Sequence, residues 1–73
     1  MITAEDAQII ASRGGGMILD AAGYTQDDLN IIASRAASGG GLIILRNASR
    51  LTPDSAKLLA SRGSGKVILD YTS

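Results

Sequence analysis

Two aspartates are the strongest candidates for chemistry in this chain. Asp20 follows the apolar residues 17–19, and Asp70 follows the equivalent residues 67–69. Both therefore stand where predicted strands end, at the edge where α/β sheets usually bind ligands. A pair of carboxylates there could hold a cation or share a proton. Leu45 is expected at the strand end between them and the chain has no histidine to complete a site, so solvated strand ends are favoured over a metal or acid–base centre.

The glycine-rich segment 63–66 (Gly-Ser-Gly-Lys) has the composition of a phosphate-binding loop. Such loops leave a strand and enter a helix, so that the helix N-terminus faces the anion. Here the segment follows a predicted helix and precedes a predicted strand, which reverses that direction. The sequence therefore predicts helix-terminating turns at these glycines and no bound nucleotide.

A serine precedes an arginine at three places, Ser12-Arg13, Ser34-Arg35 and Ser61-Arg62. The chain has no histidine or cysteine, and no lysine adjoins these serines, so no side chain is present to activate them as nucleophiles. The arginines are expected near helix ends, where a cation interacts favourably with the helix dipole. We predict a protein that is not an enzyme, with no catalytic residue, no metal site and no cofactor.

Composition limits the classes of partner. The 73 residues carry seven Lys or Arg against seven Asp or Glu, and only two aromatic side chains, Tyr24 and Tyr71. This balance lacks the basic field and stacking surface of a nucleic-acid-binding protein, and the basic patch of a membrane-surface protein. No apolar run reaches the length of a membrane span, and the N-terminus lacks a signal-peptide pattern. We expect a cytoplasmic protein that contacts neither nucleic acid nor membrane.

An internal repeat organises the chain. Two apolar residues followed by Ala-Ser-Arg recur, each time with a threonine before them and with glycines and a short apolar run after them, at 9–13, 31–35 and 58–62. The chain therefore reads as a single domain, 1–73, of three units at about 1–23, 24–49 and 50–73. A segment of a larger repeat array is the alternative, although Met1 directly before the first unit favours a natural start.

Each unit predicts a helix followed by a strand. A threonine can cap the helix, acidic residues follow in its first turn, and apolar residues recur at helical spacing. The second helix is expected to be longer, because residues 36–38 follow its repeat motif. The αβαβαβ order predicts an α/β fold with a three-stranded parallel sheet. Strand order 1-2-3 would place all helices on one face, as in a solenoid, and is favoured over 2-1-3, which would cover both faces.

This layout resembles that of short bacterial α/β repeat proteins of the leucine-rich-repeat type. The resemblance covers the whole chain at the level of layout, through an Ala-rich helix, a glycine and a short strand in each unit. The chain departs from the asparagine that follows the last strand leucine in such repeats: only Asn47, two residues after Leu45, falls at such a place, and the first and third units have Ala22 and Thr72 instead. The resemblance implies a protein-binding surface and transfers no catalytic residue.

Alternation along the predicted strands defines a candidate interface. Four apolar residues share the parity of the two aspartates, which should point away from the helices. A one-sided helix layer would leave them in water as one apolar patch, which monomers seldom expose: Ile18, Ile43, Leu45 and Ile68. We therefore predict a non-enzymatic protein-interaction or self-assembly module, either a two-fold homodimer joined through its sheets or a complex with another protein. The alternative is a small ligand-binding or catalytic regulator that uses Asp20 and Asp70.

Overall fold

Each of the three helices begins directly after a threonine. The computed structural model describes residues 1–73, with helices α1 (Ala4–Ser12), α2 (Gln26–Gly39) and α3 (Pro53–Gly63). The Oγ1 atoms of Thr3, Thr25 and Thr52 accept hydrogen bonds of 3.2, 3.1 and 3.2 Å from the backbone N–H three residues on. The predicted helix starts are confirmed, and α2, with 14 residues, is the longest helix, as expected. None of the three has the length and apolar content needed to span a membrane.

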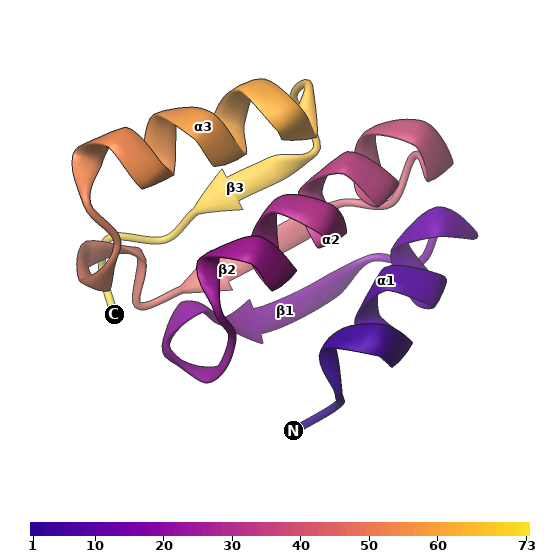
Figure 1. The fold of residues 1–73 in the computed structure, drawn as a ribbon, viewed down its shortest axis with the longest axis horizontal. Helices are drawn as coiled ribbons and strands as arrows, with labels where there is room; N and C mark the ends of the chain where they lie inside the picture. Colours follow the sequence, from indigo (N-terminus) through magenta and orange to yellow (C-terminus); the bar gives the residue numbers. More distant parts are fainter.

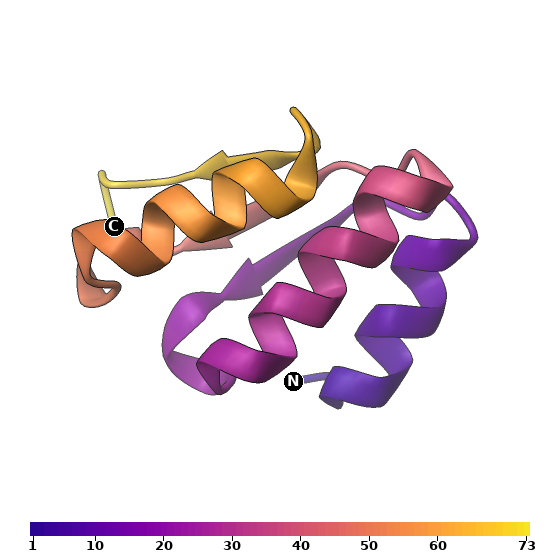
Figure 2. The same ribbon diagram turned by 45° about the horizontal axis from the view of Figure 1, so that its top comes forward.

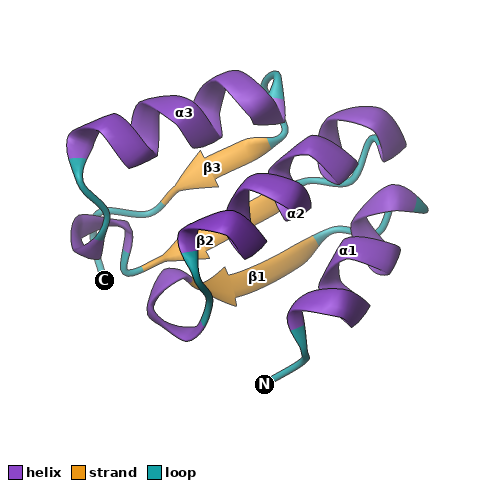
Figure 3. Cartoon of the chain, viewed as in Figure 1, coloured by secondary structure: helices purple, strands orange, loops and turns teal.

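The strands are β1 (Met17–Asp20), β2 (Ile43–Arg46) and β3 (Val67–Leu69). They form one parallel sheet in the order β1-β2-β3 (Figure 1 and Figure 3). The helices form a second layer, on one side of the sheet (Figure 2). The predicted α/β class and the 1-2-3 strand order are confirmed, and the 2-1-3 alternative is wrong.

The core lies between the sheet and the helix layer. Its largest fully buried side chains are Leu29, Ile32 and Leu59 from the helices and Ile43 and Leu45 from β2. No polar or charged residue is fully buried. The central strand therefore contributes apolar side chains to the core from the face that the helices cover.

The predicted parity of the second strand is wrong. Ile43 pairs with Met17 on one side and with Val67 on the other, so it shares their face of the sheet. Ile43 and Leu45 consequently point toward the helices and are only 1% and 2% exposed. These two residues of the predicted interface belong to the core, and Ile44 lies on the uncovered face instead.

The error comes from the residue used as the start of the second strand. Gly14, the first glycine of its triplet, has φ = +84° and lies just after α1. In the second unit Gly39 still belongs to α2, and Gly40 is the residue with positive φ, +87°. Counting the second strand from Leu42, the first apolar residue after its glycines, starts it one residue before β2 begins at Ile43. A shift of one residue moves every side chain to the opposite face.

Helix α2 approaches the end of α1 through Gly39. A methyl group added there would collide with the carbonyl oxygen of Ala11. The added residues of the second unit therefore extend α2 along the C-terminal end of α1, and only glycine allows that approach without a shift of the backbone.

Two short 3-10 turns, η1 (Ala21–Gly23) and η2 (Ala48–Arg50), connect strands to the helices that follow. The repeat pattern does not predict them. Their first residues, Ala21 and Ala48, are buried. After η1, the Tyr24 hydroxyl donates a 2.7 Å hydrogen bond to the carbonyl oxygen of Ile2, which ties this connection to the N-terminal segment.

Candidate functional site

The face of the sheet opposite the helices carries three isoleucines in line. Ile18 of β1 pairs with Ile44 of β2, which pairs with Ile68 of β3. Neighbouring strands lie about 4.8 Å apart, so the three side chains form a continuous apolar ridge. Ile18 is 66% exposed, Ile68 is 45% exposed, and Ile44 between them is half-buried. We call these three residues the isoleucine row.

The row includes two residues of the interface predicted from sequence, Ile18 and Ile68. Sequence reasoning missed Ile44, because it took Leu42, the first apolar residue after the second glycine triplet, as the counterpart of Met17. Alignment on the residue with positive φ after each helix would have identified it, since Ile44 lies four residues after Gly40 and Ile18 lies four residues after Gly14.

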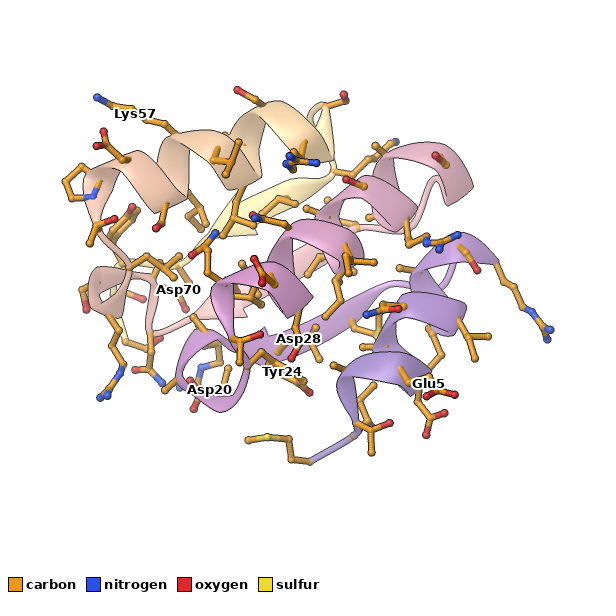
Figure 4. The ribbon with its side chains drawn as sticks, viewed as in Figure 1. Glu5, Asp20, Tyr24, Asp28, Lys57 and Asp70 are labelled. Carbon is orange, nitrogen blue, oxygen red and sulfur yellow. The ribbon has the colours of Figure 1, made fainter.

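Charged side chains border the isoleucine row at the carboxyl ends of the strands. Asp20 pairs with Arg46, and the backbone N–H of Asp70 continues the ladder on the other side of β2. The alternation of the strands places these three side chains on the face of the isoleucine row. Figure 4 shows Asp20 and Asp70 at the same end of the sheet. The expectation of Leu45 between the aspartates is wrong, because the one-residue shift puts Arg46 there.

Asp20 holds the turn after β1 and reaches the next strand end. Its Oδ1 accepts hydrogen bonds from the backbone N–H of Ala22 at 2.8 Å and from the Nδ2 of Asn47 at 2.9 Å. Asn47 has φ = +59°, the left-handed conformation that asparagine tolerates better than most residues. The Asn47 amide therefore joins the ends of β1 and β2 through side chains.

Asp70 holds the segment after β3 in a similar way. Its Oδ1 accepts from the backbone N–H of Thr72 at 2.8 Å and from the Thr72 hydroxyl, and its Oδ2 accepts from the Ser73 hydroxyl at 3.2 Å. The Ser73 Oγ also accepts from the backbone N–H of Asn47 at 3.2 Å. A chain of hydrogen bonds thus runs from Asp20 through Asn47 and Ser73 to Asp70 and crosses all three strand ends.

These contacts lower the pKa of the Asp20 carboxyl below its usual value. The side-chain amide of Asn47 has the largest effect, followed by the backbone N–H of Ala22. The positive charges of Arg50 and Arg46 act in the same direction, and partial desolvation opposes them.

The pKa of the Asp70 carboxyl is lowered as well. The hydroxyl and backbone N–H of Thr72 contribute most, and Ser73 and Arg46 add smaller effects against partial desolvation. A general acid at neutral pH needs a raised pKa, whereas both aspartates are held as carboxylates. No group of three His, Cys, Asp or Glu side chains is arranged to hold a metal ion. The geometry assigns Asp20 and Asp70 a role in holding the strand ends together.

The fold and this surface define an α/β protein whose three-stranded parallel sheet has one face covered by helices and an apolar row exposed on the other. Comparison of the chain with protein-family models, with curated proteins and with solved structures finds no match. Evidence about function therefore comes from the residues of the exposed face.

Proposed function

We propose that this chain is a non-enzymatic interaction module that associates with a second copy of itself through the open face of its sheet. Two copies would form a two-fold dimer in which the isoleucine rows pack against each other. The proposal also interprets the three helix–strand units as a short α/β solenoid of leucine-rich-repeat-like layout, with the sheet as its binding surface.

The exposure of the isoleucine row carries this proposal. Three β-branched aliphatic side chains stand in line across the sheet, with Ile18 and Ile68 largely in water. Monomeric proteins seldom leave such a contiguous apolar surface exposed. Arg46 and the two aspartates border the row, and a polar border around an apolar centre is the usual composition of a protein interface.

The size of the face also suits an interface. The molecule measures 27 × 24 × 20 Å. Figure 1 looks down the shortest axis with the helices in front of the sheet, so the open face extends along the two longer dimensions. A stable interface buries about 800 Å² on each partner, so a dimer would use the whole of this broad side.

The energetics are compatible with a dimer. Burial of about 400 Å² of apolar surface per chain would contribute roughly 10 kcal/mol of gross hydrophobic free energy per chain. The loss of rigid-body freedom on association costs on the order of 4 to 15 kcal/mol. For the two chains together a net favourable free energy of about 5 to 16 kcal/mol remains, a range that contains the roughly 8 kcal/mol of a micromolar dimer.

Substitution of Ile44 tests the proposal, with Ile43 as the contrast. Ile44→Asp places a carboxylate at the centre of the proposed interface, where burial without a partner opposes association. We expect the wild type to sediment as a dimer at tens of micromolar and Ile44→Asp to sediment as a monomer with wild-type circular dichroism. Ile43→Asp should instead unfold the chain, because Ile43 lies in the core.

Two further variants keep this test decisive. Ile31→Asp is the matched control, since Ile31 is 41% exposed on the helix layer and its substitution should leave the dimer intact. Where Ile44→Asp fails to fold, Ile18→Asp adds the same charge at a more exposed position of the row. A monomeric wild type, or a dimer that survives both Ile18→Asp and Ile44→Asp, contradicts the proposal.

A further inference from the structure

One helix position is buried in two units and exposed in the first. Ile10, Ile32 and Leu59 each stand seven residues after the threonine that caps their helix. Ile32 and Leu59 are fully buried, whereas Ile10 is 38% exposed. Helices α2 and α3 each have another helix before them in the layer, and α1 has none on that side (Figure 1). Ile10 therefore marks a surface that a preceding helix covers in the other two units.

The next position along the helix shows the opposite pattern. Ala11 and Ala33 are buried, but the equivalent Ala60 on α3 is exposed. Ala33 lies on the α3 side of α2, because a methyl group added to Gly63 would come within 4.0 Å of its Cβ. At each contact between helices inside the domain, an alanine of one helix is thus covered by the helix that follows. Ala60 has no such cover.

The outer strands leave matching backbone groups free. The N–H groups of Met17 and Asp70 bond toward β2. Alternate residues of a strand in a parallel sheet direct their backbone groups to opposite neighbours. The backbone N–H and C=O groups that point toward the two outer edges are therefore those of Val67 and Leu69 on β3 and of Ile18 on β1. The β1 strand of a second copy can therefore pair with the outer edge of β3, in the same register in which β3 pairs with β2.

An apolar hollow lies beside each end of the layer. The hollow at the α1–β1 end has a volume of ≈ 480 Å³, and six of its seven lining residues are hydrophobic, Ile10 and Met17 among them. The hollow at the α3–β3 end has a volume of ≈ 590 Å³ and is lined by Ala60 and Leu69, with three further hydrophobic residues. Both ends thus present unfilled apolar surface beside a free strand edge.

We propose that these two ends bind each other in a second copy of the chain, so that the α1–β1 end of one copy docks on the α3–β3 end of the next. Ile10 of the second copy then packs over Ala60, and its β1 extends the sheet beyond β3. The packing repeats the contacts between helices and strands that already exist inside the domain.

The charges of the two ends agree with this docking. Lys57 lines the hollow at the α3–β3 end and projects outward from α3 (Figure 4). Asp6 is exposed on α1 and stands four residues before Ile10, on the same side of the helix. Docking brings Lys57 of one copy close to Asp6 of the other.

The contact is heterologous, because it joins two different surfaces and leaves one of each free at the ends of the assembly. It leaves Ile44 and Ile68 of the isoleucine row uncovered and shares only Ile18 with that row, because Ile18 also lines the hollow at the α1–β1 end. Association through the ends therefore has no fixed size, whereas the face-to-face dimer stops at two copies. This difference separates the two proposals in a sedimentation experiment.

Two blocking variants test the end-to-end contact. Ile10→Arg blocks the α1–β1 end and Ala60→Arg blocks the α3–β3 end, both at exposed positions that should not affect folding. The average mass of the wild type should rise beyond that of the dimer between micromolar and millimolar concentration, and each variant should stop at the dimer. Ile31→Arg, on the outer surface of the helix layer, should keep that rise. Ile44→Asp should also keep it while it removes the face-to-face dimer.

Mixing the two variants provides the decisive measurement. Fluorescently labelled Ile10→Arg retains a free α3–β3 end, and Ala60→Arg retains a free α1–β1 end. We expect the labelled protein to bind Ala60→Arg at least about tenfold more tightly than it binds unlabelled Ile10→Arg. The titration with unlabelled Ile10→Arg is the control, because it measures association through the isoleucine rows alone. Equal binding in the two titrations, or a wild-type mass that does not rise beyond the dimer, overturns the proposal and leaves the ends to a different occupant.

Discussion

Asn47, which follows β2 in a left-handed conformation, connects the carboxyl ends of β1 and β3. Asn47 donates its side-chain amide to Asp20 and its backbone N–H to the hydroxyl of Ser73, which itself donates to Asp70. The equivalent residue after β1 is Ala21, whose side chain has no polar group. The link across the strand ends therefore depends on the residue in the middle unit.

Asn47→Gly isolates the contribution of that side chain. Glycine keeps the backbone N–H and adopts the left-handed conformation without strain, so only the amide is lost. The pKa of Asp20 should rise, because its largest stabilising contact is gone, and the pKa of Asp70 should stay as it is. Carboxyl-carbon NMR during a pH titration measures both. An equal change in the two aspartates would contradict the role given to the amide.

The same variant changes how stability depends on pH. A carboxyl whose pKa is lower in the folded state stabilises the fold above its unfolded value, here about 3.8, and loses that effect as pH falls through the folded value. Asn47→Gly should therefore be less stable than the wild type near pH 7, and the two should converge at about pH 2. Urea denaturation at both pH values tests this. If the free energies of unfolding of Asn47→Gly and the wild type differed by the same amount at about pH 2, the effect would come from the backbone and not from the Asp20 carboxylate.

At the scale of elements, residues that are close in the sequence were enough to predict the helices. The face of the sheet on which each strand residue lies depends on pairing between distant parts of the chain. A helix cap depends on residues within one turn, so Thr3, Thr25 and Thr52 identified all three starts. The face of a strand depends on an exact residue count from the preceding turn. Because the apolar run begins at Leu42 and β2 begins at Ile43, that count failed in the second unit, and with it the placement of Ile44 and Arg46.

The exposed ends show a second limit of prediction from the sequence. Helical spacing identifies Ile10 and Ala60 as members of the apolar face of their helices. The structure exposes both, because burial also depends on whether another helix lies alongside. α2 contacts a helix on each side, whereas α1 and α3 each contact a helix on one side only.

Loss of the N-cap of α2 should lower the stability of the whole domain. α2 packs between α1 and α3 and contributes Leu29 and Ile32 to the core. Thr25→Ala removes the acceptor for the N–H of Asp28 and should lower the free energy of unfolding by about 1 kcal/mol. Thr25→Ser retains a hydroxyl acceptor and should remain close to the wild type. Urea denaturation compares them, and equal stability of Thr25→Ala and the wild type would show that the cap contributes nothing.

At the scale of the whole molecule, the two proposed contacts share Ile18 and otherwise use different surfaces. The isoleucine row lies on the broad open face, and the end surfaces lie beside α1 and α3. A chain of 73 residues without cysteine has a small core and no disulfide, so association is an available source of further stability. Used together, the contacts would give two packed sheets, each continuing from one copy to the next.

Charges on the open face distinguish two ways of packing the isoleucine rows. If the strands of the two copies run in the same direction, two-fold symmetry places Asp20 over Asp70 and Arg46 over Arg46, which brings like charges together. If they run in opposite directions, each strand faces its own counterpart. Asp70 then lies over Lys66 of the other copy, because Lys66 stands two residues before Ile68 and shares its side of the chain. The opposite-direction arrangement is therefore favoured.

Lys66→Glu tests this arrangement, because it replaces the proposed attraction to Asp70 by repulsion. The dimer should weaken by about tenfold at low salt, and the effect should shrink as the screening length falls from about 30 Å at 0.01 M to about 3 Å at 1 M. Arg35→Glu makes the same charge change at an exposed position on the helix layer and should leave the affinity unchanged. Sedimentation equilibrium at the two salt concentrations measures both variants. A Lys66→Glu dimer as tight as the wild type at low salt rejects the opposite-direction arrangement, since in the same-direction packing Lys66 lies over Gly16, which carries no charge.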